Sequence, residues 1–83
     1  MIEEYLKAAM NTAHYEIIAD EDPYYGEIPQ LQGVWASGKS LEECRDNLQG
    51  NLEGWILVCI RQGIEIPEIS GCKLLMPKVL EVA

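Results

Sequence analysis

The sequence predicts a single α+β domain in which one antiparallel sheet packs against a long helix. Two observations carry this prediction: three short strand-like segments separated by turn residues, and a capped helical pattern that follows them at residues 40–63. A chain of 83 residues leaves room for one domain. A helical stripe precedes the strands and an extended segment follows the long helix, so the expected order is α-β-β-β-α-β.

Residues 1–13 are expected to hold the first helix. Apolar residues recur there at the spacing of one helix face, namely Ile2, Tyr5, Leu6, Ala9 and Met10. Two glutamates in the first turn suit the positive end of the helix dipole. Asn11 and Thr12 have weak helix propensity and are expected to end the helix.

Three strands are expected before the long helix. Residues 14–20 would place Tyr15, Ile17 and Ala19 on one face of a strand, and Pro23 breaks this run because proline cannot donate to a strand ladder. Residues 24–28 form the second strand, and the short connection implies an antiparallel hairpin. After a turn at residues 29–33, residues 34–37 form a short third strand.

The long helix carries the clearest local signals. Ser40 and Glu43 form a capping box, in which the Ser40 hydroxyl accepts from the Glu43 amide and the Glu43 side chain reaches back. Gly63 is the expected stop, which gives about 22 residues and a length of roughly 33 Å. The apolar stripe is Leu41, Cys44, Leu48, Leu52, Trp55 and Cys59. Gly50 and Gly54 each cost about 1 kcal/mol relative to alanine, so we expect something to pack close to that backbone.

The C-terminal part is expected to end in a sixth element. Residues 64–69 are predicted to be extended, and residues 72–76 to form a final strand after a Ser-Gly turn. The expected division is one domain over residues 1–83, with an N-terminal helix in 1–13, a core in 14–76 and a tail in 77–83.

Charge and hydropathy narrow the class of function. Six Lys and Arg residues against 14 Asp and Glu residues give a formal net charge of −8. Nucleic acids and anionic membranes bind clustered basic residues, so we expect neither as a partner. The longest apolar run, residues 55–60, is far shorter than the roughly 20 residues of a membrane span, and the N-terminus has no cationic start. We expect a cytoplasmic protein whose acidic surface suits a basic protein partner.

Several consecutive segments form an ordered pattern. They are the strand and acidic turn of residues 15–23, Tyr24-Tyr25-Gly26-Glu27-Ile28, the Pro29-Gln30-Leu31-Gln32-Gly33 turn, Val34-Trp35-Ala36, and Gly38-Lys39-Ser40-Leu41-Glu42-Glu43-Cys44. In this order they resemble the HicB-like antitoxin family, over residues 14–68. The resemblance implies a partial RNase H-like βββαβ domain that binds and neutralises HicA, a small basic ribonuclease toxin. Many members carry a C-terminal DNA-binding domain; we expect a compact subgroup without it and without direct DNA binding.

The densest acidic cluster adjoins the aromatic second strand. The candidate partner-binding residues are Asp20, Glu21, Asp22, Tyr24, Tyr25 and Glu27. Carboxylates would steer a basic partner, and aromatic rings would supply buried contact. A solvated acidic turn remains an open alternative. A divalent-metal nuclease site is another, although it needs several carboxylates to converge and sequential residues alternate in direction.

No catalytic residue, metal or cofactor is expected. His14 is the single histidine, and spacing assigns it no nucleophile or acid as a partner. Cys44, Cys59 and Cys72 form no CxxC pair, so we expect reduced, partly buried thiols.

The apolar run at residues 55–60 covers more than one face of the long helix. In a two-layer domain the helix buries one stripe, so the remaining apolar side chains need a cover. We expect a homo-oligomer, a dimer or tetramer, with Trp55, Ile56 and Ile60 at the subunit contact. Packing of the N-terminal helix over this face is the competing explanation.

The expected function is that of an antitoxin-like protein, not an enzyme, that occludes a HicA-type toxin. The first alternative is an oligomeric structural or regulatory domain that has no toxin partner. The second is a metal-dependent nuclease.

Overall fold

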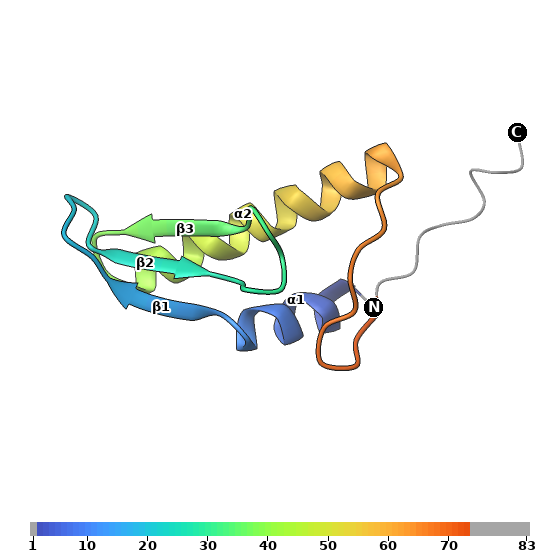
Figure 1. Ribbon diagram of the computed structural model, residues 1–83, viewed down its shortest axis with the longest axis horizontal. Coiled ribbons are helices and arrows are strands. Elements are labelled where there is room, and N and C mark those ends of the chain that lie inside the picture. The colour runs from blue at the N-terminus through green and yellow to red at the C-terminus, as the bar shows by residue number, and fades with distance from the viewer. Residues whose placement is uncertain (1, 74–83) are drawn as a thin grey trace, which may run out of the picture.

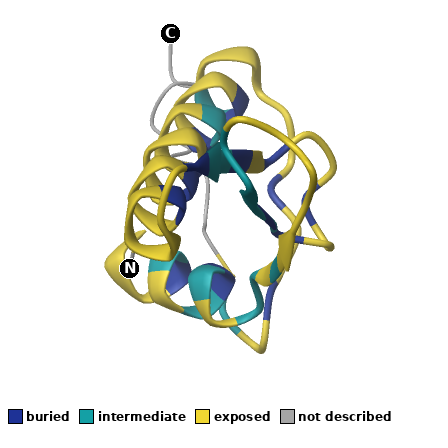
Figure 2. Ribbon diagram, turned by 90° about the vertical axis from the view of Figure 1, so that its left-hand side faces the viewer, coloured by how far each residue is buried: buried dark blue, intermediate teal, exposed yellow. Residues whose placement is uncertain are grey.

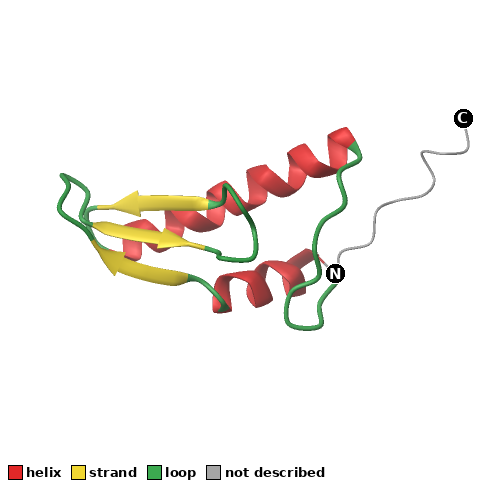
Figure 3. Ribbon diagram, viewed as in Figure 1, coloured by secondary structure: helices red, strands yellow, loops and turns green. Residues whose placement is uncertain are grey.

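A computed structural model describes residues 2–73 as two helices and a three-stranded sheet (Figure 1). The elements are α1 Ile2–Asn11, β1 His14–Ile17, β2 Tyr24–Glu27, β3 Trp35–Gly38 and α2 Leu41–Gln62. Both strand pairs are antiparallel and β2 is central. The helix α2 runs the length of the domain, passing the sheet at one end and α1 at the other (Figure 3). The predicted α+β class and the order of the first five elements are confirmed.

The strand boundaries differ from those predicted. β1 ends at Ile17 rather than at residue 20. The Ile18 N–H still donates to the Pro23 carbonyl at 2.7 Å, but Pro23 has no N–H to return the bond, and the chain then turns, with the Asp20 N–H donating to the Ile18 carbonyl at 3.1 Å. β3 begins one residue later than predicted and extends to Gly38.

The segment after α2 is only partly described. Residues 64–68 have no regular secondary structure, and Ile69 forms an isolated antiparallel bridge with Cys72. The final strand predicted at residues 72–76 falls mainly on residues 74–83, outside the described part of the chain, as does the predicted tail. The last strand of an RNase H-like βββαβ arrangement is not seen in the described part of the chain, where only the Ile69–Cys72 bridge follows α2.

Both ends of α2 follow the predicted capping chemistry. The Ser40 hydroxyl accepts from the Glu43 amide at 3.1 Å, and Glu43 Oε1 accepts from the Lys39 amide at 2.6 Å, so the capping box reaches one residue further back than predicted. At the other end Gly63 adopts the left-handed conformation, with φ of 71°. This conformation suits glycine and ends the helix.

One core cluster joins the two helices, the sheet and the segment after α2. Its buried members are Tyr5, Ala9, Ile28, Leu31, Val34, Ala36, Leu48, Leu52, Ile56, Cys59, Ile66 and Ile69. The Tyr5 hydroxyl donates to the Pro67 carbonyl at 2.6 Å, which ties α1 to the segment after α2. In Figure 2 the buried positions of α2 face the rest of the chain, while its outer side is exposed.

The buried stripe of α2 departs from the predicted one. Leu41 is 50% exposed, Trp55 is half-buried, and Ile56 takes the buried position instead, with 0% exposure. A helix repeats every 3.6 residues, so positions three and four after Leu52 both lie close to the buried side. Packing within the core cluster, which the stripe alone does not reveal, buries Ile56.

Two glycines of the sheet leave room for close contacts with α2 and with the Tyr15 ring. A Cβ atom added at Gly38 would lie 2.5 Å from the Cys44 backbone nitrogen, in the first turn of α2. One added at Gly26 would lie 2.8 Å from the Tyr15 ring and 3.2 Å from the Cys44 sulfur. The side of β2 and β3 that carries these positions therefore faces α2.

Candidate functional site

The other side of the sheet points away from α2 and is here called the open face. Gly26 and Ala36 are cross-strand partners on the α2 side, and side chains alternate along a strand. The register therefore places six side chains on the open face: His14, Glu16, Tyr25, Glu27, Trp35 and Ser37. They form two rows, His14–Glu27–Trp35 and Glu16–Tyr25–Ser37.

Two aromatic rings form the centre of the open face. Tyr25 on β2 and Trp35 on β3 stack with ring centroids 6.0 Å apart and an interplanar angle of 28°. They are diagonal neighbours, a separation that aromatic side chains can span. Trp35 is 53% exposed, so much of this aromatic surface is accessible.

Carboxylates flank the aromatic pair. The Tyr25 hydroxyl donates to Glu27 Oε1 at 3.0 Å. Burial raises the pKa of Tyr25, and the hydrogen bond to Glu27 and the charges of Glu27 and Glu16 raise it further. On β1, His14 Nε2 lies 3.7 Å from Glu16 Oε1, with both side chains more than half exposed. The open face therefore combines aromatic surface with negative potential.

The connection between β2 and β3 turns part of the open face into a hollow. Ile28, Leu31 and Val34 are buried, and three backbone hydrogen bonds of 2.9–3.1 Å close the loop on itself, from Ile28 to Val34, Leu31 to Ile28 and Val34 to Leu31. The hollow measures about 430 Å³ and is lined by this loop together with Tyr25, Glu27 and Trp35. A side chain of a partner can therefore enter beside the aromatic pair.

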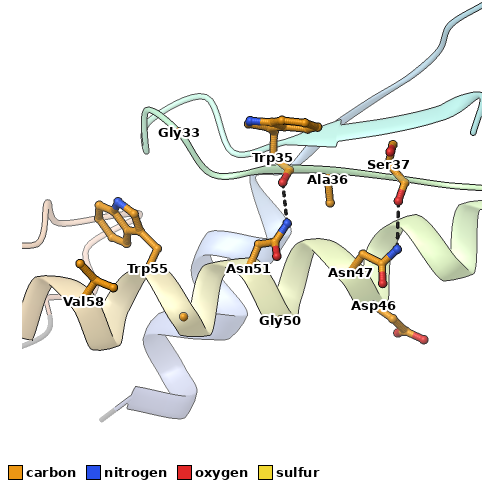
Figure 4. A pocket seen from close by; sticks show the side chains of 11 residues that line it. Gly33, Trp35, Ala36, Ser37, Asp46, Asn47, Gly50, Asn51, Trp55 and Val58 are labelled. Carbon is orange, nitrogen blue, oxygen red and sulfur yellow. Dashed lines mark hydrogen bonds between the residues drawn. The ribbon is translucent and has the colours of Figure 1, made fainter. Parts of the chain in front are cut away.

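A second, larger groove lies between the outer edge of β3 and α2 (Figure 4). It measures about 770 Å³, and its walls include Trp35, Trp55 and the helix backbone at Gly50 and Gly54. No described atom outside the helix lies within 4 Å of a Cβ added at either glycine, so no described packing explains them.

Two asparagines cross this groove from α2 to β3. Asn51 Nδ2 donates to the Trp35 carbonyl at 2.8 Å, and Asn47 Nδ2 donates to the Ser37 carbonyl at 3.0 Å (Figure 4). These carbonyls point away from β2, because Ala36 and Gly38 face it in the ladder. The outer edge of β3 is thus bonded to the helix that covers it.

The structure brings together only some of the predicted partner-binding residues. Tyr25 and Glu27 lie side by side on the open face. Tyr24 lies on the opposite side of β2, as its adjacency to Tyr25 predicts. Asp20, Glu21 and Asp22 lie in the turn between β1 and β2, where Asp20 Oδ1 accepts from the Glu21 amide at 2.7 Å.

Glu16 and Trp35 are members of the open face that the candidate set lacked. Alternation within the first predicted strand already places Glu16 opposite in direction to Tyr15. The position of Trp35 next to Tyr25 depends on the register of β2 against β3, which the turn at residues 28–34 sets.

The three residues predicted at a subunit contact differ in how far they are buried. Ile56 is in the core of its own chain, which corrects its expected position at a surface, and Trp55 and Ile60 are half-buried. The apolar side chains of this run that reach the surface are Leu57, 63% exposed, and Val58, 48% exposed. Part of the apolar surface of α2 is therefore packed against the core cluster and part is exposed.

The cysteine thiols, the possible metal ligands and the hydropathy of the helices are the remaining features that bear on function. Burial raises the pKa of the Cys44 and Cys59 thiols, and Cys72 is half-buried. Among residues 2–73, no three or more His, Cys, Asp and Glu side chains are grouped closely enough to hold a metal ion. Neither α1 nor α2 has the length and hydropathy to cross a membrane.

Fold and surface together define a small acidic α+β domain with an exposed sheet face. A family model described as UPF0150-like matches residues 4–67. The crystal structure of TTHA0281 from Thermus thermophilus is similar, with a TM-score of 0.88 and 51% sequence identity over 92% of this chain and 94% of that one. A comparison with curated proteins gives no match. The chain belongs to the UPF0150-like family.

Proposed function

We propose that this protein is an antitoxin that binds a small basic ribonuclease toxin of the HicA type and blocks it by occlusion. Membership of the UPF0150-like family and the resemblance to HicB-like antitoxins support this assignment. The observation that carries it is the open face, where Tyr25 and Trp35 stack beside the carboxylates of Glu27 and Glu16. It offers both the apolar area and the negative charge that a basic protein surface complements.

The proposed mechanism is binding without a chemical step. The net charge of −8 speeds the encounter with a cationic toxin in the cytoplasm. The aromatic pair then supplies the desolvated contact that holds the complex, since aromatic residues dominate binding hot spots. A toxin covered in this way cannot admit RNA to its active site.

Co-expression with a small basic ribonuclease toxin of the HicA type tests the proposal. The expected result is that the two proteins copurify and that growth, arrested by the basic protein alone, is restored. Trp35→Ala should weaken rescue, whereas Glu21→Gln, in the turn outside the open face, should preserve it. If the basic protein neither copurifies nor becomes harmless, the antitoxin assignment is wrong and the fold assignment is unaffected.

A second proposal concerns self-association. Leu57 and Val58 expose apolar area on α2, close to the helix backbone left open at Gly50 and Gly54. A second copy packed there would bury this surface and would leave the open face available. The same contact would serve the alternative function, an oligomeric structural domain without a toxin.

Light scattering on the purified chain measures this association. We expect a dimer or tetramer, which Leu57→Glu should dissociate because it would bury an unpaired charge. Leu41→Glu is the matched control, since Leu41 is also about half exposed but lies at the other end of α2. A monomer at micromolar concentration would refute self-association.

A further inference from the structure

The hollow on the open face has the chemistry of a binding site for a planar cation. Its walls are the stacked rings of Tyr25 and Trp35 and the carboxylate of Glu27, and the β2–β3 loop closes its far side. None of its described lining residues is a lysine or an arginine. A cation that enters therefore meets aromatic faces and an acceptor without displacing a resident positive charge.

The geometry points to an arginine side chain of the partner as the occupant of this hollow, its guanidinium against the Trp35 and Tyr25 rings and its N–H groups directed to Glu27. The inference rests on the proposed function, in that the partner is a basic protein, and it specifies which side chain of that partner is recognised. It also assigns a role to Glu16 on the neighbouring strand β1, which supplies a second negative charge near the guanidinium.

A guanidinium fits this site better than other cations. It is planar and weakly hydrated, so it stacks on an aromatic face while its edge donates hydrogen bonds. An ammonium group is a compact and strongly hydrated charge that cannot stack its surface on the aromatic rings as a planar guanidinium does. Calcium and magnesium prefer several oxygen ligands together, whereas the hollow presents one carboxylate beside two rings.

The carboxylate of Glu27 remains able to accept from a guest. Its Oε1 atom accepts from the Tyr25 hydroxyl at 3.0 Å, and an ionised carboxylate offers about four lone-pair sites. The hydrogen bond from Tyr25 also fixes the orientation of the carboxylate beside the ring. A guest that stacks on the aromatic pair therefore finds a preoriented acceptor.

The test uses a small probe and does not depend on a toxin. Nα-acetyl-arginine amide is titrated into the full chain, and the indole N–H signals of Trp35 and Trp55 are followed by NMR. We expect the Trp35 signal to move and the Trp55 signal to stay, because Trp55 lies across the other groove. The neutral analogue Nα-acetyl-citrulline amide keeps the shape and removes the charge, so it should shift Trp35 at least about threefold less.

Two charge-matched variants locate the acceptor. Glu27→Gln should reduce the slope of the Trp35 shift about two- to threefold, the range of an exposed ion pair. Glu21→Gln removes the same charge from the turn and should leave the slope within experimental error. The site is refuted if citrulline amide acts as strongly as arginine amide, or if both variants weaken the response equally.

The outcomes separate this site from the antitoxin function. If the basic protein binds but arginine amide does not move Trp35, the antitoxin function stands and the arginine site is wrong. If arginine amide moves Trp35 in a Glu27-dependent way but no basic protein is neutralised, the site stands and the antitoxin function is wrong.

Discussion

Tyr25 and Glu27 form the most informative pair of single residues in the protein. Both side chains are half-buried, and the Tyr25 hydroxyl donates to the Glu27 carboxylate. Burial raises the pKa of Tyr25, and the hydrogen bond and the charges of Glu27 and Glu16 raise it further, because a phenolate could not donate to the carboxylate and would face two negative charges. The carboxylate in turn gains a donor in a surface that is otherwise partly apolar.

Glu27→Gln should therefore lower the pKa of Tyr25 toward its ordinary value. Burial, the largest cause that raises this pKa, remains in the variant, as does the charge of Glu16, while the hydrogen bond to a carboxylate and its charge are lost. An alkaline titration of the tyrosine ring signals by NMR measures the change. Glu21→Gln is the control, and an unchanged Tyr25 titration in Glu27→Gln would contradict the hydrogen bond.

The three thiols should differ in reactivity. Burial raises the pKa of Cys44 and Cys59 and leaves little thiolate at neutral pH, and both side chains are buried. Cys72 is only half-buried. Brief treatment with iodoacetamide followed by mass spectrometry should show a single adduct at Cys72, and three adducts after unfolding. Equal labelling of all three sites in the folded protein would be inconsistent with this core.

At the scale of secondary-structure elements, the contact between β3 and α2 organises the domain. The first turn of α2 sits directly on the end of β3, where Gly38 has no side chain to keep them apart. Further along α2, the backbone at Gly50 and Gly54 has open space around it instead. Gly38 is therefore required by a close contact between β3 and α2, whereas no described contact requires a glycine at residues 50 and 54.

Gly38→Ala and Gly54→Ala should shift stability in opposite directions. The new methyl group at residue 38 would meet backbone atoms of Cys44, and overpacking of this kind costs about 1–3 kcal/mol. At residue 54 alanine meets nothing within 4 Å and should stabilise the helix by about 1 kcal/mol. Urea unfolding measures both. A destabilised or dissociated Gly54→Ala protein would mean that another chain packs at this glycine.

The elements were predictable to the extent that their signals are local. Ser40 and Gly63 mark both ends of α2 within a few residues, so its bounds follow from the sequence. Tyr25 and Glu27 could be placed on one face by alternation alone. The partnership of Trp35 with Tyr25 could not, because it depends on strand register, and the burial of Ile56 depends on packing across elements.

At the scale of the whole molecule, the acidic turn between β1 and β2 and the aromatic pair of the open face lie in different places. The formal net charge is −8, and the acidic turn that includes Glu21 lies outside the open face. Exposed charges act over distances comparable to the Debye length, about 8 Å at physiological ionic strength. Under the proposed function, the acids govern the approach of the basic partner, and the open face governs its retention.

Kinetics of toxin binding should show this division. Tyr25→Ala should lose at least about 2 kcal/mol of binding free energy, mainly through faster dissociation, if the ring is a hot spot. Glu21→Gln should mainly slow association and flatten its salt dependence. Surface plasmon resonance at several salt concentrations separates the two effects. Faster dissociation in Glu21→Gln, with little change in Tyr25→Ala, would reverse the assignment.

The two borders of the sheet differ in what they offer to another strand. On β3 the outward carbonyls of Trp35 and Ser37 are occupied by Asn51 and Asn47, so an incoming strand would first have to break these bonds. On β1 the backbone groups of Tyr15 and Ile17 point away from β2, and Ile17 is 76% exposed. An edge strand with unpaired backbone groups is a template to which a further strand can pair, whether from the same chain or from a neighbouring molecule. Within the described part of the chain, an added strand would therefore meet unoccupied carbonyls beyond β1, whereas two asparagine side chains of α2 occupy the outward carbonyls of β3.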